Sequence, residues 1–368
     1  MGESAMENSK HIQKAGGNSN QFQIENVTFV NGITEQRAKE IFDEMYARTC
    51  KEYTQEACEK AFARVSSFEN HLMERVVRVE GAMEAFREPA FQFLLRSAQK
   101  TAAATEREAD YELLSELLMR RTKSQKDRKT NAGISRAVEI VDQIDDDALC
   151  ALTVAYATLA ITPLSGSCTN GLNSLNNMFE NLIYTTLPEG SEWISHLDLL
   201  DAVRINPISR LINMDNIFKS RLDGYICAGI PIDSENHSRA KEELGKVGIN
   251  PVLLVENELL PGYVRIPVVS KNEICNLRFQ TASGNEVVMH DNGEIIQTLE
   301  RVWDLYSTDI KLINTVNEEF RRKWLDYDSL HKVYDWWNSI PIAFTVTQVG
   351  IVLACANAKK YDNTFPDL

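Results

Sequence analysis

The stretch DQIDDDALCALTVAYATLAI, residues 142–161, decides the fold class. Three aspartates at 145–147 stand just before a nearly continuous run of apolar residues. Negative side chains are favourable at a helix start, because they meet the positive end of the helix dipole. A helix that is apolar on all sides has to be enclosed by other elements. The stretch therefore predicts a central, fully buried helix within a helical domain.

Helical patterns extend from this stretch toward the beginning of the chain. Thr54 is placed to cap a long helix that ends near Glu80. Within it Cys58, Val65 and Leu72 follow one another at intervals of seven residues, which favours a helix inside a bundle over a dimer seam. Further helices are predicted at Ala90–Ala103, Thr105–Arg121, Ser135–Ile144, Gly171–Thr186 and Ser191–Ile205.

The pattern changes after residue 220. Short β-rich runs surround a predicted helix at Ser234–Gly245, FQTASGNEVVMHDNGE resembles a hairpin, and Glu294–Ser339 reads as helical and rich in aromatic residues. IPIAFTVTQVGIVLACA, residues 340–356, is too short for a membrane span and predicts a buried strand and helix. We therefore expect a mainly α fold, with a helical bundle N-terminal domain at 34–165, a helical connection at 166–219 and a smaller α/β C-terminal portion at 220–368.

Residues 1–33 are predicted to form a flexible tail that carries one strand. Residues 1–20 are polar, whereas QFQIENVTFV, residues 21–30, alternates apolar and polar positions through Phe22 and Ile24 and again through Val27 and Phe29. No partner strand is expected before residue 220. A single strand cannot satisfy its own backbone hydrogen bonds. It must join a distant sheet, pair with another copy of the chain, or stay unfolded until something binds.

Composition narrows the class of protein. The 53 acidic and 39 basic residues give a net charge of -14, which opposes attraction to nucleic-acid phosphates. Seven scattered cysteines without a CxxC pair indicate reduced thiols and a cytoplasmic location. The first residues lack the apolar core of a secretory signal. We expect no metal, no cofactor and no membrane partner.

One helical segment offers acid/base chemistry. In EWISHLDLLD, Glu192 and His196 lie four residues apart and share a helix face, and Asp198 follows. A metal would need a further ligand from elsewhere. The segment is the candidate for a hydrolytic site, and a solvated helix face is the alternative.

One basic segment opposes the acidic whole. RRTKSQKDRKTNAGISR, residues 120–136, gathers seven basic residues around Asp127. A helix turn at Asn131–Gly133 could present free backbone donors to an anion. The segment predicts a site for an anion or an acidic partner, and a solvated basic loop is the alternative. The residues assigned to it are Arg120, Arg121, Lys126, Arg128 and Lys129.

The chain resembles a bacterial protein family of unassigned function. The resemblance lies in NGITEQRAKEIFDEMY, in residues 98–149, in PGYVRIPVVSK and in FTVTQVGIVLACANAKK. It implies no catalytic residues. In layout alone the chain is also similar to the helical abortive-infection proteins of bacteria, which implies a role in defence against phage.

The sequence therefore favours a non-enzymatic, self-associating sensor or scaffold, with antiviral defence as the implied setting and Phe22, Ile24, Val27 and Phe29 as the contact residues. Two alternatives stay open. One is a hydrolase that uses the carboxylates and His196, and the other is a nucleic-acid binder that uses residues 120–136.

Overall fold

The computed structural model describes residues 33–49, 54–124, 127–280, 286–288 and 293–366. Most of them are helical, and the strands among them form small antiparallel sheets, so the prediction of a mainly α protein is confirmed. Residues 21–30, with the strand predicted there, lie outside the described residues. No described helix is both long enough and apolar enough to cross a membrane.

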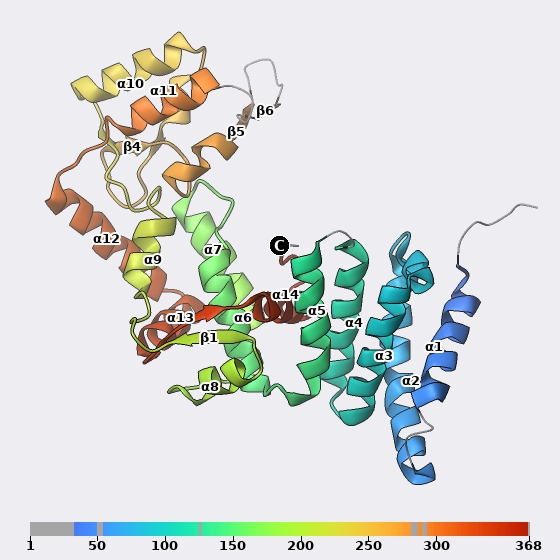
Figure 1. Cartoon of the computed structure of the whole chain (residues 1–368). Coiled ribbons are helices and arrows are strands. Elements are labelled where there is room, and N and C mark those ends of the chain that lie inside the picture. Colours follow the sequence, from blue (N-terminus) through green and yellow to red (C-terminus); the bar gives the residue numbers. More distant parts are fainter. Residues whose placement is uncertain (1–32, 50–53, 125–126, 281–285, 289–292, 367–368) are drawn as a thin grey trace, which may run out of the picture.

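A row of packed helices forms one side of the molecule (Figure 1). Thr54 caps the second helix through a hydrogen bond from the Ala57 N–H, as predicted. Val65 and Leu72 are buried where this helix packs against the third and fourth, so the heptad pattern serves the interior of one chain. The row consists of α1 (Glu35–Thr49), α2 (Gln55–Arg78), η2 (Ala82–Arg87), α3 (Pro89–Ala104), α4 (Glu108–Lys123), α5 (Arg128–Ile140) and η3 (Val141–Gln143).

The central helix is α6 (Asp146–Ala160), which begins where the aspartates predicted it. The Asp145 side chain accepts hydrogen bonds from the N–H groups of Asp147 and Ala148. Every residue from 148 to 155 is buried. Two more helices, α7 (Cys168–Leu182) and α14 (Gln348–Tyr361), pack on α6, and α14 also contacts α4 and α5. The prediction of a central helix is confirmed, and it is fully buried over residues 148–155, whereas Tyr156, Leu159 and Ala160 are half-buried.

A two-stranded ribbon lies beside this centre. The strand β7 (Ala343–Val346) precedes α14, as predicted, and pairs antiparallel with β1 (Val203–Asn206). The helix predicted at Ser191–Ile205 is therefore wrong in its second half. It ends as α8 (Glu192–Leu199), and the chain then turns into β1. The expectation of no strand before residue 220 is also wrong, because β1 has a partner about 140 residues later that local periodicity does not reveal.

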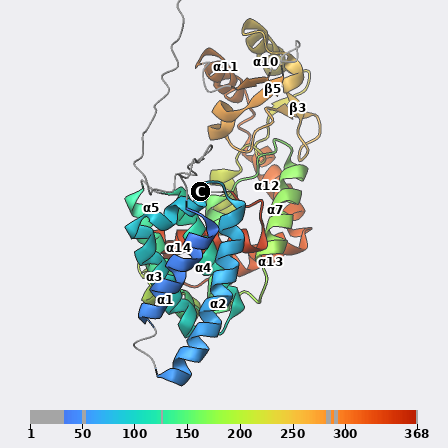
Figure 2. The ribbon, with the colours of Figure 1, turned by 90° about the vertical axis from the view of Figure 1, so that its right-hand side faces the viewer.

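Residues 227–306 form a lobe with its own apolar core, separate from the core of the helices. Figure 2 shows it standing above the helical row. The predicted hairpin is present, and the chain enters the lobe after α9 (Met214–Arg221) and leaves it into α12 (Ile310–Leu325) and α13 (Asp328–Ser339). The lobe contains β2 (Ile230–Pro231), α10 (Glu235–Lys246), η4 (Pro251–Leu253), β3 (Val255–Glu256), β4 (Tyr263–Arg265), η5 (Lys271–Asn276), β5 (Arg278–Gln280), β6 (Glu286–Val288) and α11 (Gly293–Trp303).

Much of the predicted aromatic group holds α12 and α13 on the helical body. Trp324, Trp336 and Trp337 are buried in the larger core. Their indole N–H groups donate to the carbonyl oxygens of Leu330, Pro188 and Ile212, respectively. Trp303 and Tyr306 instead stack on each other in the lobe, with ring centroids 4.7 Å apart.

The lobe meets the body at the loop before α7. A Cβ atom on Gly166 would lie 2.0 Å from the carbonyl oxygen of Pro267, so the two backbones touch there. The buried Arg265 guanidinium donates to Gly166 O at 2.7 Å. Its charge also lies over the Tyr225 ring, 5.6 Å from the centroid. Close backbone contact and a buried cation thus fix the lobe on α7.

We expect Gly166→Ala and Gly245→Ala to change stability in opposite directions. The first places a methyl group against Pro267 and should lower the free energy of unfolding by about 1–3 kcal/mol, the usual cost of overpacking. Gly245 lies in α10 with open space around it, so alanine should raise that free energy by roughly 0.5–1 kcal/mol. Urea denaturation of both variants measures the difference, and equal effects would contradict the close contact.

Candidate functional site

The acid/base residues of α8 hold neighbouring elements in place. His196 Nε2 accepts a hydrogen bond from the Asp145 N–H at 3.2 Å, at the start of α6. Asp198 Oδ1 accepts from the Ile205 N–H at 3.2 Å, along the outer edge of β1. Glu192 is exposed at the first turn of α8. His196 and Asp198 therefore have structural partners, and their catalytic role stays a prediction.

The described residues also offer no ready metal centre. No group of three or more His, Cys, Asp or Glu side chains in the described ranges is arranged to hold an ion. Cys227 lies in a cleft, but burial raises the pKa of its thiol to about 12. A thiol with that pKa is protonated at neutral pH and is a poor nucleophile.

The basic segment divides between several environments. Arg120 lies beside Cys355 on α14, where its charge partly offsets the rise in the thiol pKa that burial causes. Arg136 forms ion pairs with Glu139 and Asp201, both at 3.3 Å. Arg128 and Lys129 are exposed and Arg121 is half-buried, whereas Lys126 lies outside the described residues. The anion- or partner-binding role of this segment stays a prediction.

The predicted anion-binding turn at Asn131–Gly133 is wrong. The helix α5 begins earlier, at Arg128, and the Asn131 N–H already donates to the carbonyl oxygen of Asp127. The Asp127 carboxylate caps the helix start and accepts from the Lys129 N–H at 2.9 Å. The Asp127 carboxylate thus satisfies one of the free N–H groups at the start of α5.

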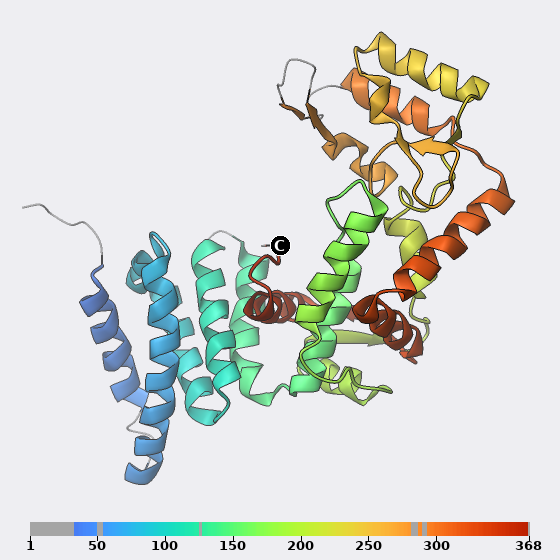
Figure 3. The same ribbon diagram turned by 180° about the vertical axis from the view of Figure 1, so that it is seen from behind.

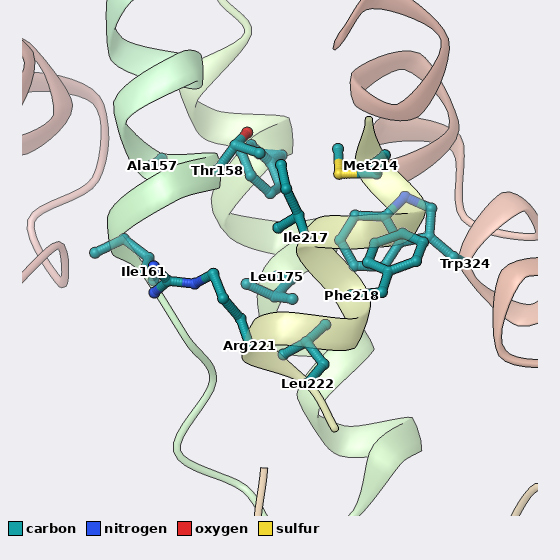
Figure 4. Close-up of a pocket in the computed structure, with 11 residues that line it drawn as sticks. Ala157, Thr158, Ile161, Leu175, Met214, Ile217, Phe218, Arg221, Leu222 and Trp324 are labelled. Atoms are coloured by element: carbon teal, nitrogen blue, oxygen red, sulfur yellow. The ribbon is translucent and has the colours of Figure 1, made fainter. Parts of the chain in front are cut away.

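One small apolar pocket has too little volume for a ligand. It has a volume of about 20 Å³ and lies among apolar residues of α6, α7 and α9 (Figure 4). A single water needs at least about 10–15 Å³. Arg221, which borders the cavity, donates to the carbonyl oxygens of Leu159 and Ala160 and so caps the end of α6. The cavity is a packing feature.

A larger cleft, of about 490 Å³, lies between the lobe and the helices α9 and α12. Its polar groups pair with one another. Asp223 accepts from the Lys271 N–H at 3.1 Å, and the Lys271 ammonium lies 3.2 Å from Asp304. Burial raises the pKa of Asp223. Such junctions between units are common places for ligands, and here Asp223 and Lys271 already have partners within the chain.

The lobe also places a carboxylate on the start of α7. Glu258 accepts from the N–H groups of Cys168 and Thr169, both at 2.9 Å, and from the Thr169 hydroxyl. Burial opposes ionisation of Glu258, but these hydrogen bonds outweigh it and lower its pKa. The helix dipole adds to the attraction. This anion contact is a second polar attachment of the lobe, beside that of Arg265.

A further candidate surface is the outer edge of β7. The Thr347 N–H donates to the Ala202 carbonyl oxygen, so these two residues form a hydrogen-bonded pair. In an antiparallel ribbon, hydrogen-bonded and non-hydrogen-bonded pairs alternate along the strands. Phe344 and Val346 therefore direct their backbone groups away from β1. Within the described residues these groups have no hydrogen-bond partner. Because buried backbone groups are nearly always paired, we expect this edge to be open to solvent.

The outer edge of β1 is closed by contrast. The Ile205 N–H donates to Asp198, and the Val203 carbonyl accepts from the Arg204 guanidinium at 3.1 Å. The helix α8 packs along this strand. Only β7 thus leaves the ribbon open to another strand. Sequence reasoning missed this edge because β1 was assigned to a helix.

A family model described only as ":-like" matches residues 32–368. The chain belongs to that family, whose description names no activity, ligand or partner. No curated protein and no solved structure matches the chain. The similarity in layout to abortive-infection proteins finds no support in these comparisons.

We expect Glu258→Gln to loosen the lobe in a pH-dependent way. The folded pKa of Glu258 is lowered, so its contribution to stability is present above the unfolded pKa of about 4.3 and is lost as the pH falls through the folded value. At pH 7 the variant should lose about 1 kcal/mol, because Glu258 is open to solvent. Thermal unfolding between pH 3 and pH 7 measures this loss.

The matched control is Glu256→Gln, at an exposed residue of β3. It should unfold like the parent at every pH. If both variants lose the same stability, or if the loss from Glu258→Gln does not shrink toward pH 3, the contact with α7 does not have the assigned energy.

Proposed function

We propose that this member of the family is a self-associating interaction protein, in which residues 21–30 of one copy make the contact with another. The position of Ile33 carries the proposal. Its N–H donates to Glu84 at one end of the helical row. Figures 1 and 3 place α1 at that end, whereas the described strands lie beyond the other end.

Limited reach disfavours pairing within one copy. Successive packing contacts lead from α1 to α3, from α3 to α5 and from α5 to α14, which follows β7 directly. Helix axes pack about 8–10 Å apart, so three steps amount to roughly 25–30 Å. An extended chain covers about 3.5 Å per residue. Val27–Val30 would fall short of β7, and Phe22–Glu25 would reach it only with the intervening residues almost fully extended.

A partner strand in another copy faces no such limit. An unpaired strand with alternating apolar side chains is a ready element for joining chains edge to edge. The candidate acid/base residues also favour an interaction role over hydrolysis, because His196 and Asp198 already accept hydrogen bonds from N–H groups at the start of α6 and in β1. We place the interaction role ahead of hydrolysis and of nucleic-acid binding.

Native mass spectrometry of three full-length or shortened chains tests the proposal. The full chain should appear as a multiple of 41.7 kDa. Removing residues 1–31 should give a monomer, because it removes the strand and spares Ile33 and its contact with Glu84. Removing only residues 1–20 is the control and should leave the assembly intact.

Two results would count against the proposal. A full chain that stays monomeric at high micromolar concentration would remove its basis. An assembly that persists without residues 1–31 would show that the contact lies elsewhere.

A further inference from the structure

This inference rests on the self-association proposed above and identifies its acceptor. We propose that the outer edge of β7 in one copy receives the strand of residues 21–30 from a second copy. The edge offers the N–H and C=O groups of Phe344 and Val346, which point away from β1. A strand laid beside them would satisfy these groups and extend the ribbon to three strands.

The side chains of the two segments match in pattern. On the ribbon, Phe344 and Val346 lie on one face with Val203 and Ile205 across the ladder. This face packs inward: Val203 is fully buried, and the Phe344 ring meets Trp193 edge-on with centroids 5.5 Å apart. An incoming strand could continue the apolar face with Phe22 and Ile24.

The opposite face is polar on both segments. Arg204 and Thr345 are exposed on the ribbon. In the incoming strand Gln23 and Glu25 alternate with the apolar residues and would fall on the same side. A strand shifted by one residue would bury glutamine and glutamate, so the pattern also selects the register.

Other strand edges suit the tail less well. The edge of β1 is closed by Asp198 and Arg204. In the three-stranded sheet, β2 contains Pro231, which has no N–H to donate. The strand β3 has two residues, and only Glu256 directs its backbone outward, because the Asn257 N–H bonds to Tyr263 O. The edge of β7 offers a longer run of free groups than these.

Hydrogen exchange of the full-length chain tests the acceptor without any substitution. Ala343 and Thr345 already bond to β1, so their N–H groups should exchange alike at all concentrations. The N–H groups of Phe344 and Val346 should become protected once copies associate. A peptide spanning residues 341–347 should then carry two fewer deuterons above the assembly concentration than below it.

Val346→Pro provides a second test in the full-length chain. Proline removes an outward donor and leaves the bonds to β1 in place, so assembly should be lost while the helical circular dichroism is kept. The matched control Glu256→Pro removes an outward donor from β3 and should still assemble. If Val346→Pro does not fold, the exchange measurement decides alone.

The outcomes separate the two proposals. Assembly by mass with unchanged exchange at Phe344 and Val346 would overturn the acceptor and leave self-association through residues 21–30 standing. No assembly at any concentration would overturn both. Concentration-dependent protection confined to these two amides supports the β7 edge.

Discussion

The packing of α14 on α6 is the contact on which the rest of the structure depends. Both helices are buried nearly all round, and their many alanines let the axes approach closely. Polar contacts also cross the interface: Tyr156 and Cys355 share a side-chain hydrogen bond, and the Asn357 side chain donates to the Thr153 hydroxyl at 2.9 Å. A buried amide left unpaired would cost about 1–3 kcal/mol, so this bond favours one register of the two helices.

That register positions two other parts of the molecule. Because α14 also packs on α4 and α5, it joins the row of helices to the centre. Gly350, in the first turn of α14, touches the carbonyl oxygen of Ala202, and a Cβ atom there would lie 2.1 Å from it. The same turn thus fixes the β1–β7 ribbon. The lobe depends less on α14, because it has its own core and attaches through Arg265 and Glu258 near the start of α7.

Features that depend on neighbouring residues could be predicted from the sequence, whereas features that depend on residues far apart in the chain could not. The cap at Asp145, the cap at Thr54 and the buried strand and helix of residues 340–356 follow from charge, capping and periodicity. The strand β1 has four residues, and its partner lies about 140 positions away, so a helix pattern running on from α8 concealed it. The turn at Asn131–Gly133 was misplaced because Asp127 starts α5 earlier than the glycine suggested.

For the candidate site, the sequence shows which residue types are present but not which groups they contact. No local pattern indicates that His196 and Asp198 accept hydrogen bonds from the N–H groups of Asp145 and Ile205.

The two edges of the β1–β7 ribbon differ, and this difference is the main structural support for the proposed function. An exposed strand edge invites unwanted pairing, and proteins usually cover it or place charges on it. Here β1 is covered in this way by α8, Asp198 and Arg204. Among the described residues, no side chain forms a hydrogen bond with the outward backbone groups of Phe344 and Val346 on β7. In the same chain, residues 21–30 have an alternating apolar and polar sequence, and the few residues between them and Ile33 limit their reach to this edge. An unfilled acceptor edge and a segment that reaches it more easily from a second copy are the physical basis on which we propose self-association.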